Sequence, residues 1–309
     1  MAFVIRRLLA AIPVVFGITV IAFLLIHLSP GDPAKVILFG SQAGPSQITA
    51  LRHQLGLDQP LWQQYVNFVG QLLHGDLGTS YLTKNTVAFE LLSRAPSTLV
   101  LTGAAMLVAV AIGVPLGMVA GSRPNSVIDG VARAMSFIGG AVPYFFLALL
   151  LVLLFSVHLG WLPAIDDGTV GGLVIPAVSL GWGYAAILTR LIRGRVIDEF
   201  QSEYVRSARA RGASELRVLL AHVLRNSSTP VITTIGLQFG NILTGAAITE
   251  TIFGRPGLGS FLASAITSKN IPVVQGSVVV IGVGYVVINL LVDIAVGAID
   301  PRSRILEAS

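Results

Sequence analysis

The residues most suited to chemistry in this sequence are arginines gathered in one polar segment. The stretch EYVRSARARGASELRVLLAHVLRN, residues 203–226, holds five of them in a chain that is otherwise rich in Leu, Val, Ala, Ile and Gly. Guanidinium groups bind carboxylates and phosphates through paired, charge-assisted hydrogen bonds. The simplest interpretation of the segment is therefore a basic anchor that contacts the head groups of anionic lipids.

The sequence contains no recognisable catalytic or metal-binding motif. The chain has no cysteine, and its five histidines lie too far apart for a local metal-ligand motif. A phosphate-binding P-loop needs a lysine after a glycine, and none of Lys35, Lys84 and Lys269 follows one. Motifs of serine hydrolases and zinc peptidases are also missing from the sequence. We expect no catalytic residue, no metal and no cofactor, so partner subunits would bind any ATP that drives the protein.

The elements that position the arginines are predicted to be membrane-spanning helices. Of the 309 residues, 54% are hydrophobic and 11% are charged, whereas soluble domains have about 25% charged residues, and the mean hydropathy is +0.81. A spanning helix needs about 20 mostly apolar residues. Six segments qualify: Leu8–Leu28, Thr98–Ala120, Ala134–Val157, Leu173–Leu191, Pro230–Ile252 and Val274–Ala298. The predicted fold class is all-α, a polytopic membrane protein with six transmembrane helices.

The distribution of basic residues predicts the orientation of these spans. With six spans, both termini lie on one side, and 14 of the 20 Lys and Arg residues fall on that side. Cytoplasmic loops carry the excess of Lys and Arg. Both termini and residues 203–226 are therefore predicted to be cytoplasmic, and we expect membrane lipids but no nucleic acid as partners.

The arginine-rich segment has an internal order that a simple lipid anchor does not need. Apolar residues recur at helical spacing on both sides of Gly212, which can end a helix, and Ser214 is suited to begin the next one. These residues are Phe200, Tyr204, Val205 and Ala208 before the glycine, and Leu216, Leu219, Leu220 and Val223 after it. The pattern predicts a helix–glycine–helix unit whose apolar ridge docks into a groove of a cytoplasmic partner.

The stretch YVRSARARGAS resembles the cytoplasmic EAA loop of ABC importer membrane subunits, with Arg206 in place of the family's Glu. Four further blocks resemble the dipeptide/oligopeptide permease family in order: LGLDQPLWQQY, GDLGTSY, ITETIFGRPGLG and IDPRSR. The resemblance implies a type I ABC importer permease of the bacterial cytoplasmic membrane. It implies that residues 192–229 form a loop that couples the permease to ATP hydrolysis. The residues carried over to this role are Glu203, Tyr204, Arg206, Ser207, Ala208, Arg211, Gly212 and Glu215.

The resemblance also implies a set of partners and a class of substrate. The expected partners are a second homologous permease subunit, one or two ABC ATPase subunits and an extracytoplasmic peptide-binding protein. The expected substrates are dipeptides or oligopeptides, and relatives within the family leave glutathione, nickel complexes and haem open. A proton-coupled carrier, with Glu250 and Asp293 as relays, is the alternative from another class.

Polar residues within the fifth predicted span are candidates for a translocation pathway. Gln238, Asn241 and Thr244 advance by three along one face, and Glu250 lies near the outer end. Hydrogen bonds to neighbouring helices would explain the same residues. Glycines spaced by four are predicted to allow close helix packing instead; they are Gly113, Gly117, Gly121, Gly236 and Gly240.

Four regions are predicted along the chain. Residues 1–28 form the cytoplasmic N-terminus and first span, and residues 29–97 form an extracytoplasmic segment with three short amphipathic helices. That segment is expected either to lie on the outer membrane surface or to receive a binding protein. Residues 98–299 form a five-helix core that includes the coupling loop, and residues 300–309 form a cytoplasmic tail.

Overall fold

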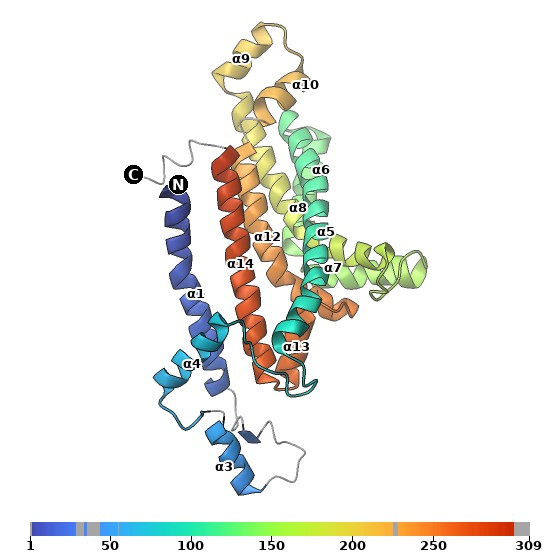
Figure 1. The fold of residues 1–309 in the computed structure, drawn as a ribbon. Helices are drawn as coiled ribbons and strands as arrows, with labels where there is room; N and C mark the ends of the chain where they lie inside the picture. Colours follow the sequence, from blue (N-terminus) through green and yellow to red (C-terminus); the bar gives the residue numbers. More distant parts are fainter. Residues whose placement is uncertain (1, 29–33, 36–43, 55, 225–227, 300–309) are drawn as a thin grey trace. The chain divides into compact units, whose positions relative to one another are not determined.

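The computed structural model describes residues 2–28, 34–35, 44–54, 56–224 and 228–299 (Figure 1). The predicted tail, residues 300–309, lies outside the described residues. Helices account for nearly all the regular structure in these ranges, where the only β-pairing is an isolated antiparallel bridge between Thr79 and Thr86. The all-α prediction is therefore confirmed.

Five helices are long and apolar enough to cross a membrane, and a bent pair of helices makes a sixth possible span. The five are α1 (Ala2–Leu28), α5 (Val87–Ser122), α8 (Val170–Phe200), α12 (Ser228–Phe253) and α14 (Ile271–Ile299). The first helix of the bent pair is α6 (Val127–Ala141). The second is α7 (Tyr144–Leu151), which continues without a break into the π-helix η1 (Val152–His158).

The third predicted span differs from a single straight helix. Between α6 and the helix that follows, the chain turns by 104°. Pro143 has no amide hydrogen and disfavours helical backbone at the preceding residue. Val142 accordingly adopts an extended conformation, with φ −86° and ψ 120°. Apolar composition alone predicted the span, and the proline divides it.

The second predicted span is longer at its beginning than expected. α5 starts at Val87, eleven residues before the predicted Thr98, and contains 36 residues. At 1.5 Å per residue, its length is about 54 Å, which exceeds the roughly 30 Å of a bilayer core. The third amphipathic pattern of residues 29–97 is therefore the first part of this long helix.

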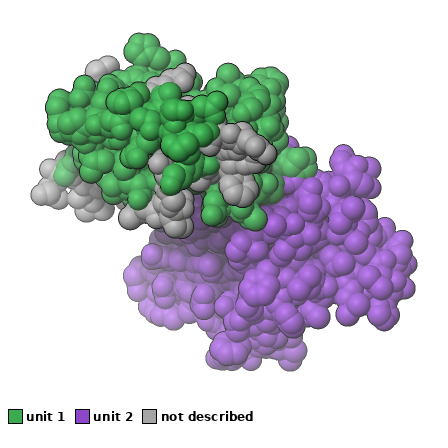
Figure 2. Space-filling model, turned by 90° about the horizontal axis from the view of Figure 1, so that it is seen from below, with its two compact units in different colours: residues 1–96, 256–287 green, residues 97–255, 288–309 purple. Residues whose placement is uncertain are grey.

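The chain divides into two compact units, which Figure 2 distinguishes by colour. Unit 1 contains residues 1–96 and 256–287, and unit 2 contains residues 97–255 and 288–309. The segment 256–287, which the sequence analysis assigned to the permease core, thus groups with the N-terminal residues.

Unit 1 is built around α1, α4 (Leu61–Leu73), α13 (Leu258–Thr267) and the first turns of α5 and α14. α1 and α4 meet through aromatic side chains, where the Phe23 ring lies 5.4 Å from that of Tyr65. The Tyr65 hydroxyl shares a 2.8 Å hydrogen bond with Thr19. A small apolar core joins Val87 and Leu91 of α5 to the other elements, with Leu258, Ala265 and Val273. The short helix α3 (Pro45–Gln54) precedes α4.

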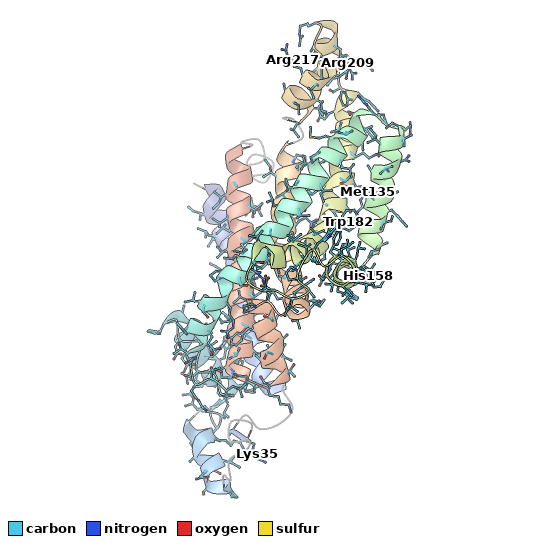
Figure 3. All side chains as sticks on the ribbon, turned by 90° about the vertical axis from the view of Figure 1, so that its right-hand side faces the viewer. Lys35, Met135, His158, Trp182, Arg209 and Arg217 are labelled. Carbon is cyan, nitrogen blue, oxygen red and sulfur yellow. The ribbon has the colours of Figure 1, made fainter. Side chains whose placement is uncertain are left out.

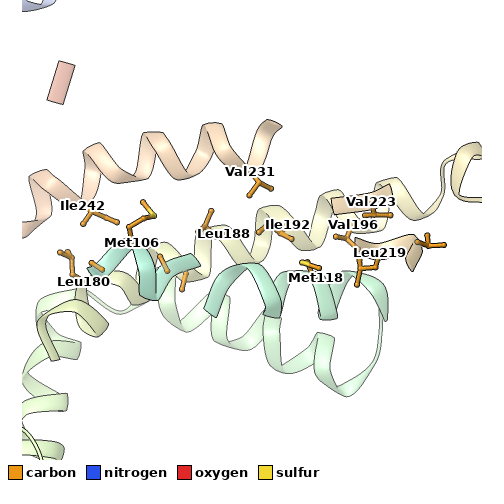
Figure 4. Packing of buried hydrophobic residues seen from close by; sticks show 14 of the residues in the cluster. Met106, Met118, Leu180, Leu188, Ile192, Val196, Leu219, Val223, Val231 and Ile242 are labelled. Carbon is orange, nitrogen blue, oxygen red and sulfur yellow. The ribbon is translucent and has the colours of Figure 1, made fainter. Parts of the chain in front are cut away.

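Unit 2 has the larger core, which runs along α8 and contacts α5 and α12 (Figure 4). Leu188 and Ile192 of α8 are fully buried, as is Ile242 of α12. Removing such side chains from water stabilises the fold by about 1.5–3 kcal/mol each. The same cluster continues past the end of α8 to Val218 and Val223.

Glycines allow α5 and α8 to touch backbone to backbone. A Cβ atom at Gly113 would lie 2.8 Å from the Ala185 carbonyl oxygen, and one at Gly117 would lie 2.8 Å from that of Thr189. At Gly121 it would lie 2.7 Å from the Val196 side chain. These distances are shorter than carbon atoms tolerate. The packing prediction for these three glycines is confirmed.

Gly236 of α12 packs closely against a neighbouring helix in the same way. A Cβ atom at Gly236 would overlap the side chain of Val292 on α14. Gly240 is buried. A close helix contact at Gly236 is therefore also confirmed.

Candidate functional site

The arginine-rich segment forms the predicted helix–glycine–helix unit, hereafter the coupling unit, residues 203–223. α9 (Glu203–Ala210) ends before Gly212, whose φ of +82° is in the left-handed region that favours glycine. α10 (Glu215–Arg217) follows and continues into the π-helix η2 (Val218–Val223). Ser214 occupies the N-cap position, although its side chain makes no capping hydrogen bond. Figures 1 and 3 show this unit beyond the end of α8, with Arg209 and Arg217 labelled on it in Figure 3.

Part of the apolar ridge of the coupling unit faces inward, whereas Leu216 and Leu220 remain exposed, at 65% and 49%, so docking into a partner stays a prediction for these two residues. Val205 and Ala208 of α9 are 0% and 3% exposed, and both join the core of unit 2. Leu219 and Val223 are buried in the same cluster. The chain's own α8 packs against this inward part of the ridge. The inward part of the ridge therefore anchors the unit, and the exposed leucines Leu216 and Leu220 are left for contact with a partner.

The outward side of α9 is polar. Glu203, Arg206, Ser207 and Arg211 are exposed, and Arg206 pairs with Glu203 at 3.0 Å. Beyond Gly212, Glu215 is exposed as well. Of the eight residues predicted for coupling, Ala208 is buried and Tyr204 is half-buried, with its hydroxyl donating to the Glu199 carboxylate. A partner can contact the others directly.

Two residues of the coupling unit form a clamp across Gly212, and one of them was not predicted. The Arg209 guanidinium donates two hydrogen bonds to the Glu215 carboxylate, at 2.8 Å and 2.9 Å. It also lies over the Phe200 ring, 5.0 Å from the centroid. These hydrogen bonds lower the pKa of Glu215 below its ordinary value. The clamp links α9 to α10 across the turn. Opposite charges six residues apart around a glycine were the sequence pattern that could have indicated it.

The predicted pathway residues of α12 lie on one exposed face. Asn241 and Thr244 are exposed and Gln238 is half-buried. The Asn241 amide donates to Gln238 Oε1 at 3.2 Å, and the Thr244 hydroxyl donates to the Gly240 carbonyl at 3.3 Å. Leu237 and Ile248 are exposed on the same helix, at 51% and 50%. This α12 stripe is a mixed polar and apolar surface whose hydrogen bonds stay within its own helix.

Glu250 is separated from the α12 stripe. Its side chain is fully buried and accepts a hydrogen bond from the Thr98 hydroxyl of α5. Asp293, the other acidic group considered for proton relay, is half-buried on α14. The structure thus brings Gln238, Asn241 and Thr244 together and places Glu250 in a helix contact.

A buried ion pair next to Glu250 was not predicted. Arg255 donates to Asp166 at 2.7 Å and to the Ser97 carbonyl at 3.3 Å. The backbone amide of Asp166 donates to the Phe253 carbonyl at 2.8 Å. The end of α12 is therefore tied to the loop before α8 and to α5. Asp166 and Arg255 are 89 positions apart, so no local pattern could reveal the pair.

The described residues contain no group of three or more His, Asp or Glu side chains that could hold a metal ion. The functional features of unit 2 are therefore surfaces and helix contacts: the coupling unit, the α12 stripe and the ion pair at its end.

Comparison with known proteins agrees with this arrangement. Residues 113–305 match the model of the binding-protein-dependent transport system inner membrane component, and residues 1–102 match that of its N-terminal region. The glutathione transport system permease protein GsiC of Escherichia coli (strain K12) is 39% identical over 302 residues, covering 98% of both chains. The di/tripeptide transport system permease protein DppB of Pseudomonas aeruginosa (strain UCBPP-PA14) is 38% identical over 332 residues, covering 98% of this chain and 99% of the relative.

The fold is also similar to a solved structure. A chain of the MetNI methionine ABC transporter in an inward-facing conformation superimposes with a TM-score of 0.55 and 18% identity, covering 69% of this chain and 97% of that one. This likeness confirms the permease fold predicted from the sequence. With two family models spanning nearly the whole length, the chain belongs to the family of inner membrane components of binding-protein-dependent transport systems.

Proposed function

We propose that this permease is the membrane subunit of an ATP-driven importer that carries dipeptides or oligopeptides across the bacterial cytoplasmic membrane. Relatives of nearly the same length, which carry names of di/tripeptide and glutathione permeases, support the peptide class. Glutathione is itself a small peptide, so one chemical class covers both names. ATPase subunits supply the energy, since the sequence has no P-loop.

The anchoring of the coupling unit is the observation that carries the mechanism. Its exposed polar side can contact an ATPase subunit, while Val205 and Val218 belong to the same buried cluster as Ile192 of α8. Protein interiors are close-packed and transmit displacement. A movement of the ATPase against α9 is therefore passed to α8, and from α8 to the α12 helix packed along it.

The α12 stripe is the proposed contribution of this chain to the translocation pathway. A second, homologous permease would face it and close the route. Polar groups on a membrane helix that bond only within their own helix retain acceptors and donors for a hydrated substrate. Buried Glu250 supports the outer end of this helix in the proposal. Both termini and the coupling unit lie in the cytoplasm, and residues 29–97 lie outside, as the excess of basic residues on one side requires.

Reconstituted transport tests the proposal. The complex of both permeases and the ATPases is placed in liposomes, with the binding protein outside and a labelled tripeptide as substrate. We expect uptake that requires ATP and the binding protein and persists when the membrane potential and proton gradient are abolished. Uptake driven by a proton gradient without ATP would instead establish the carrier mechanism.

Cysteine labelling of the same complex tests the pathway. The chain has no cysteine of its own, so Asn241→Cys and Thr244→Cys introduce single thiols on the stripe. We expect polar thiol reagents to label them, with rates that differ between nucleotide-free and ATP-trapped complexes, because thiolates form where water reaches. Ala246→Cys, at a buried position on the same helix, is the matched control. Protection at both stripe positions in both states would refute the pathway.

A further inference from the structure

Unit 1 contains an open cleft that the proposed transport mechanism does not use. Its volume is about 780 Å³, within the range of about 300–1,000 Å³ typical of ligand sites. The lining comes from α1, α4, the loop after α4 and the first turn of α14. Phe23 and Phe68 contribute aromatic surface, and several other lining side chains, among them Gln71, Gln275 and Tyr81, carry amides or a hydroxyl.

Tyr81, at the rim of the cleft, is held by a small hairpin. The Gly78 carbonyl accepts from the Val87 amide at 2.9 Å, and the Ser80 amide donates to the Asn85 carbonyl at 2.9 Å. Asn270, 189 positions away from Tyr81, is 3% exposed and accepts from its backbone amide at 3.1 Å. The Asn270 amide also donates to the Ser80 hydroxyl at 2.8 Å. The backbone at Tyr81 is thus held both by the hairpin and by Asn270.

Backbone strain is concentrated in the segments that hold Tyr81. Among the described residues, three that are not glycine have positive φ, and two of them are Lys84 (62°) and Lys269 (54°). Lys84 lies in the hairpin, and Lys269 directly precedes Asn270. Such conformations cost about 1–3 kcal/mol each and occur preferentially at functional sites.

Polar atoms of the cleft retain unused hydrogen-bonding capacity. Within the described part of the chain, the Tyr81 hydroxyl and the Gln71 amide have no hydrogen-bond partner. Burial raises the pKa of Tyr81 to about 12, so its hydroxyl remains a donor at neutral pH. Asp76 uses Oδ1 to accept from the Gly78 amide at 2.8 Å, which leaves Oδ2 available. An unpaired donor therefore lies in the same cleft as an unfilled carboxylate oxygen.

The charges of the lining define the ligand. Asp76 contributes a negative charge, and the described lining includes no Lys or Arg; its histidine, His53, already pairs with Asp58 at 2.8 Å. A peptide amino terminus, with pKa about 8, is mostly cationic at neutral pH and fits this environment. A free carboxylate would have no cation to pair with inside the cleft.

We propose that this cleft binds the amino-terminal part of a short peptide, with Asp76 accepting from the α-ammonium group and Tyr81 donating to a backbone carbonyl. The inference rests on the proposed function for the substrate class only. The site shares no residue with the α12 stripe, and its polar residues Asp76 and Tyr81 belong to the segment proposed to lie outside the membrane. It would hold a peptide on the permease itself, independently of the binding protein.

Calorimetry on the permease–ATPase complex in lipid nanodiscs, without nucleotide or binding protein, tests the site. Trialanine amide, trialanine and N-acetyl-trialanine amide are the probes. We expect saturable binding of trialanine amide, with trialanine no tighter and the acetylated peptide at least about tenfold weaker, because acetylation removes the charge. Tyr81→Phe should weaken binding about 3- to 10-fold, the range for one neutral hydrogen bond, and Asp76→Asn about tenfold or more.

Tyr65→Phe is the matched control, because it removes a phenol hydroxyl that bonds Thr19 outside the cleft; it should leave peptide affinity unchanged. The inference would be overturned if the unmodified complex showed no saturable binding. It would also be overturned if Tyr81→Phe and Asp76→Asn bound the peptide as tightly as the unmodified complex. A result in which these variants weaken only the binding protein's association would overturn it too. ATP-dependent uptake by the unmodified complex is measured separately, so its outcome for the transport proposal does not depend on this assay.

Discussion

Glycine is required for different reasons in the α5–α8 contact and in the coupling unit. Along α5 and α8, Gly117 and Gly181 have ordinary helical backbone, and a Cβ atom would strike a carbonyl oxygen of the facing helix. At Gly212 nothing lies within 4 Å of the Cβ position, but φ is +82°. One region needs glycine for space and the other for backbone conformation.

The difference shows how each region would respond to change. Two rigid backbones in contact cannot move apart without disturbing every layer of the core, whereas an exposed turn can strain without affecting the helices beneath it. Substitutions between α5 and α8 should therefore alter stability, and substitutions at Gly212 should alter coupling in a protein that still folds.

The largest loss of folding stability is expected for Gly181→Ala. The added Cβ atom would overlap the Ala105 carbonyl oxygen, so the two helices must separate, at a cost of about 1–3 kcal/mol or more. Thermal unfolding in detergent measures the loss. Gly130→Ala on α6 is the control, since its Cβ meets no atom within 4 Å, and it should be neutral or stabilise by up to about 1 kcal/mol. Equal melting temperatures for the two variants would show that the contact can relax.

A smaller effect on stability is expected for Gly212→Val. The left-handed conformation costs a residue with a side chain about 1–2 kcal/mol, so α9 and α10 should change their angle. ATP hydrolysis should then proceed with reduced peptide uptake per ATP, measured in liposomes. Gly212→Asn should restore most of the coupling, because Asn tolerates this conformation better. Normal coupling in Gly212→Val would mean that the turn geometry has no part in transmission.

The smallest effect is expected for the clamp between Arg209 and Glu215. Both side chains are largely exposed, so a double-mutant cycle with Arg209→Gln and Glu215→Gln should give a coupling energy below about 1 kcal/mol at neutral pH. Because the folded pKa of Glu215 is lowered, this contribution is complete above the ordinary carboxyl pKa. It disappears as the pH falls through the lowered value. Melting temperatures of the four proteins at neutral and acidic pH measure it; a coupling energy that does not change with pH would exclude the charge pair as its source.

The helical periodicity of residues 203–223 was sufficient to predict two helices and their break at Gly212. It could not predict where the apolar ridge would pack. Periodicity shows that Val205 and Ala208 share a face, but a partner's groove and the chain's own α8 bury such a face equally well. The clamp of Arg209 was missed for a related reason, because its partner Glu215 lies beyond the turn.

The sequence by itself determined the membrane class, most of the spans, the glycines at helix contacts and the family. These properties depend on composition and on patterns within about 20 residues, which the bilayer and the helix repeat impose directly. Only the tertiary structure decided that Val205 and Ala208 face inward. It also decided the Asp166–Arg255 pair and the hydrogen bond from the Tyr81 backbone to Asn270. The last two contacts join residues 89 and 189 positions apart. Their geometry depends on how whole helices pack, which no local pattern encodes.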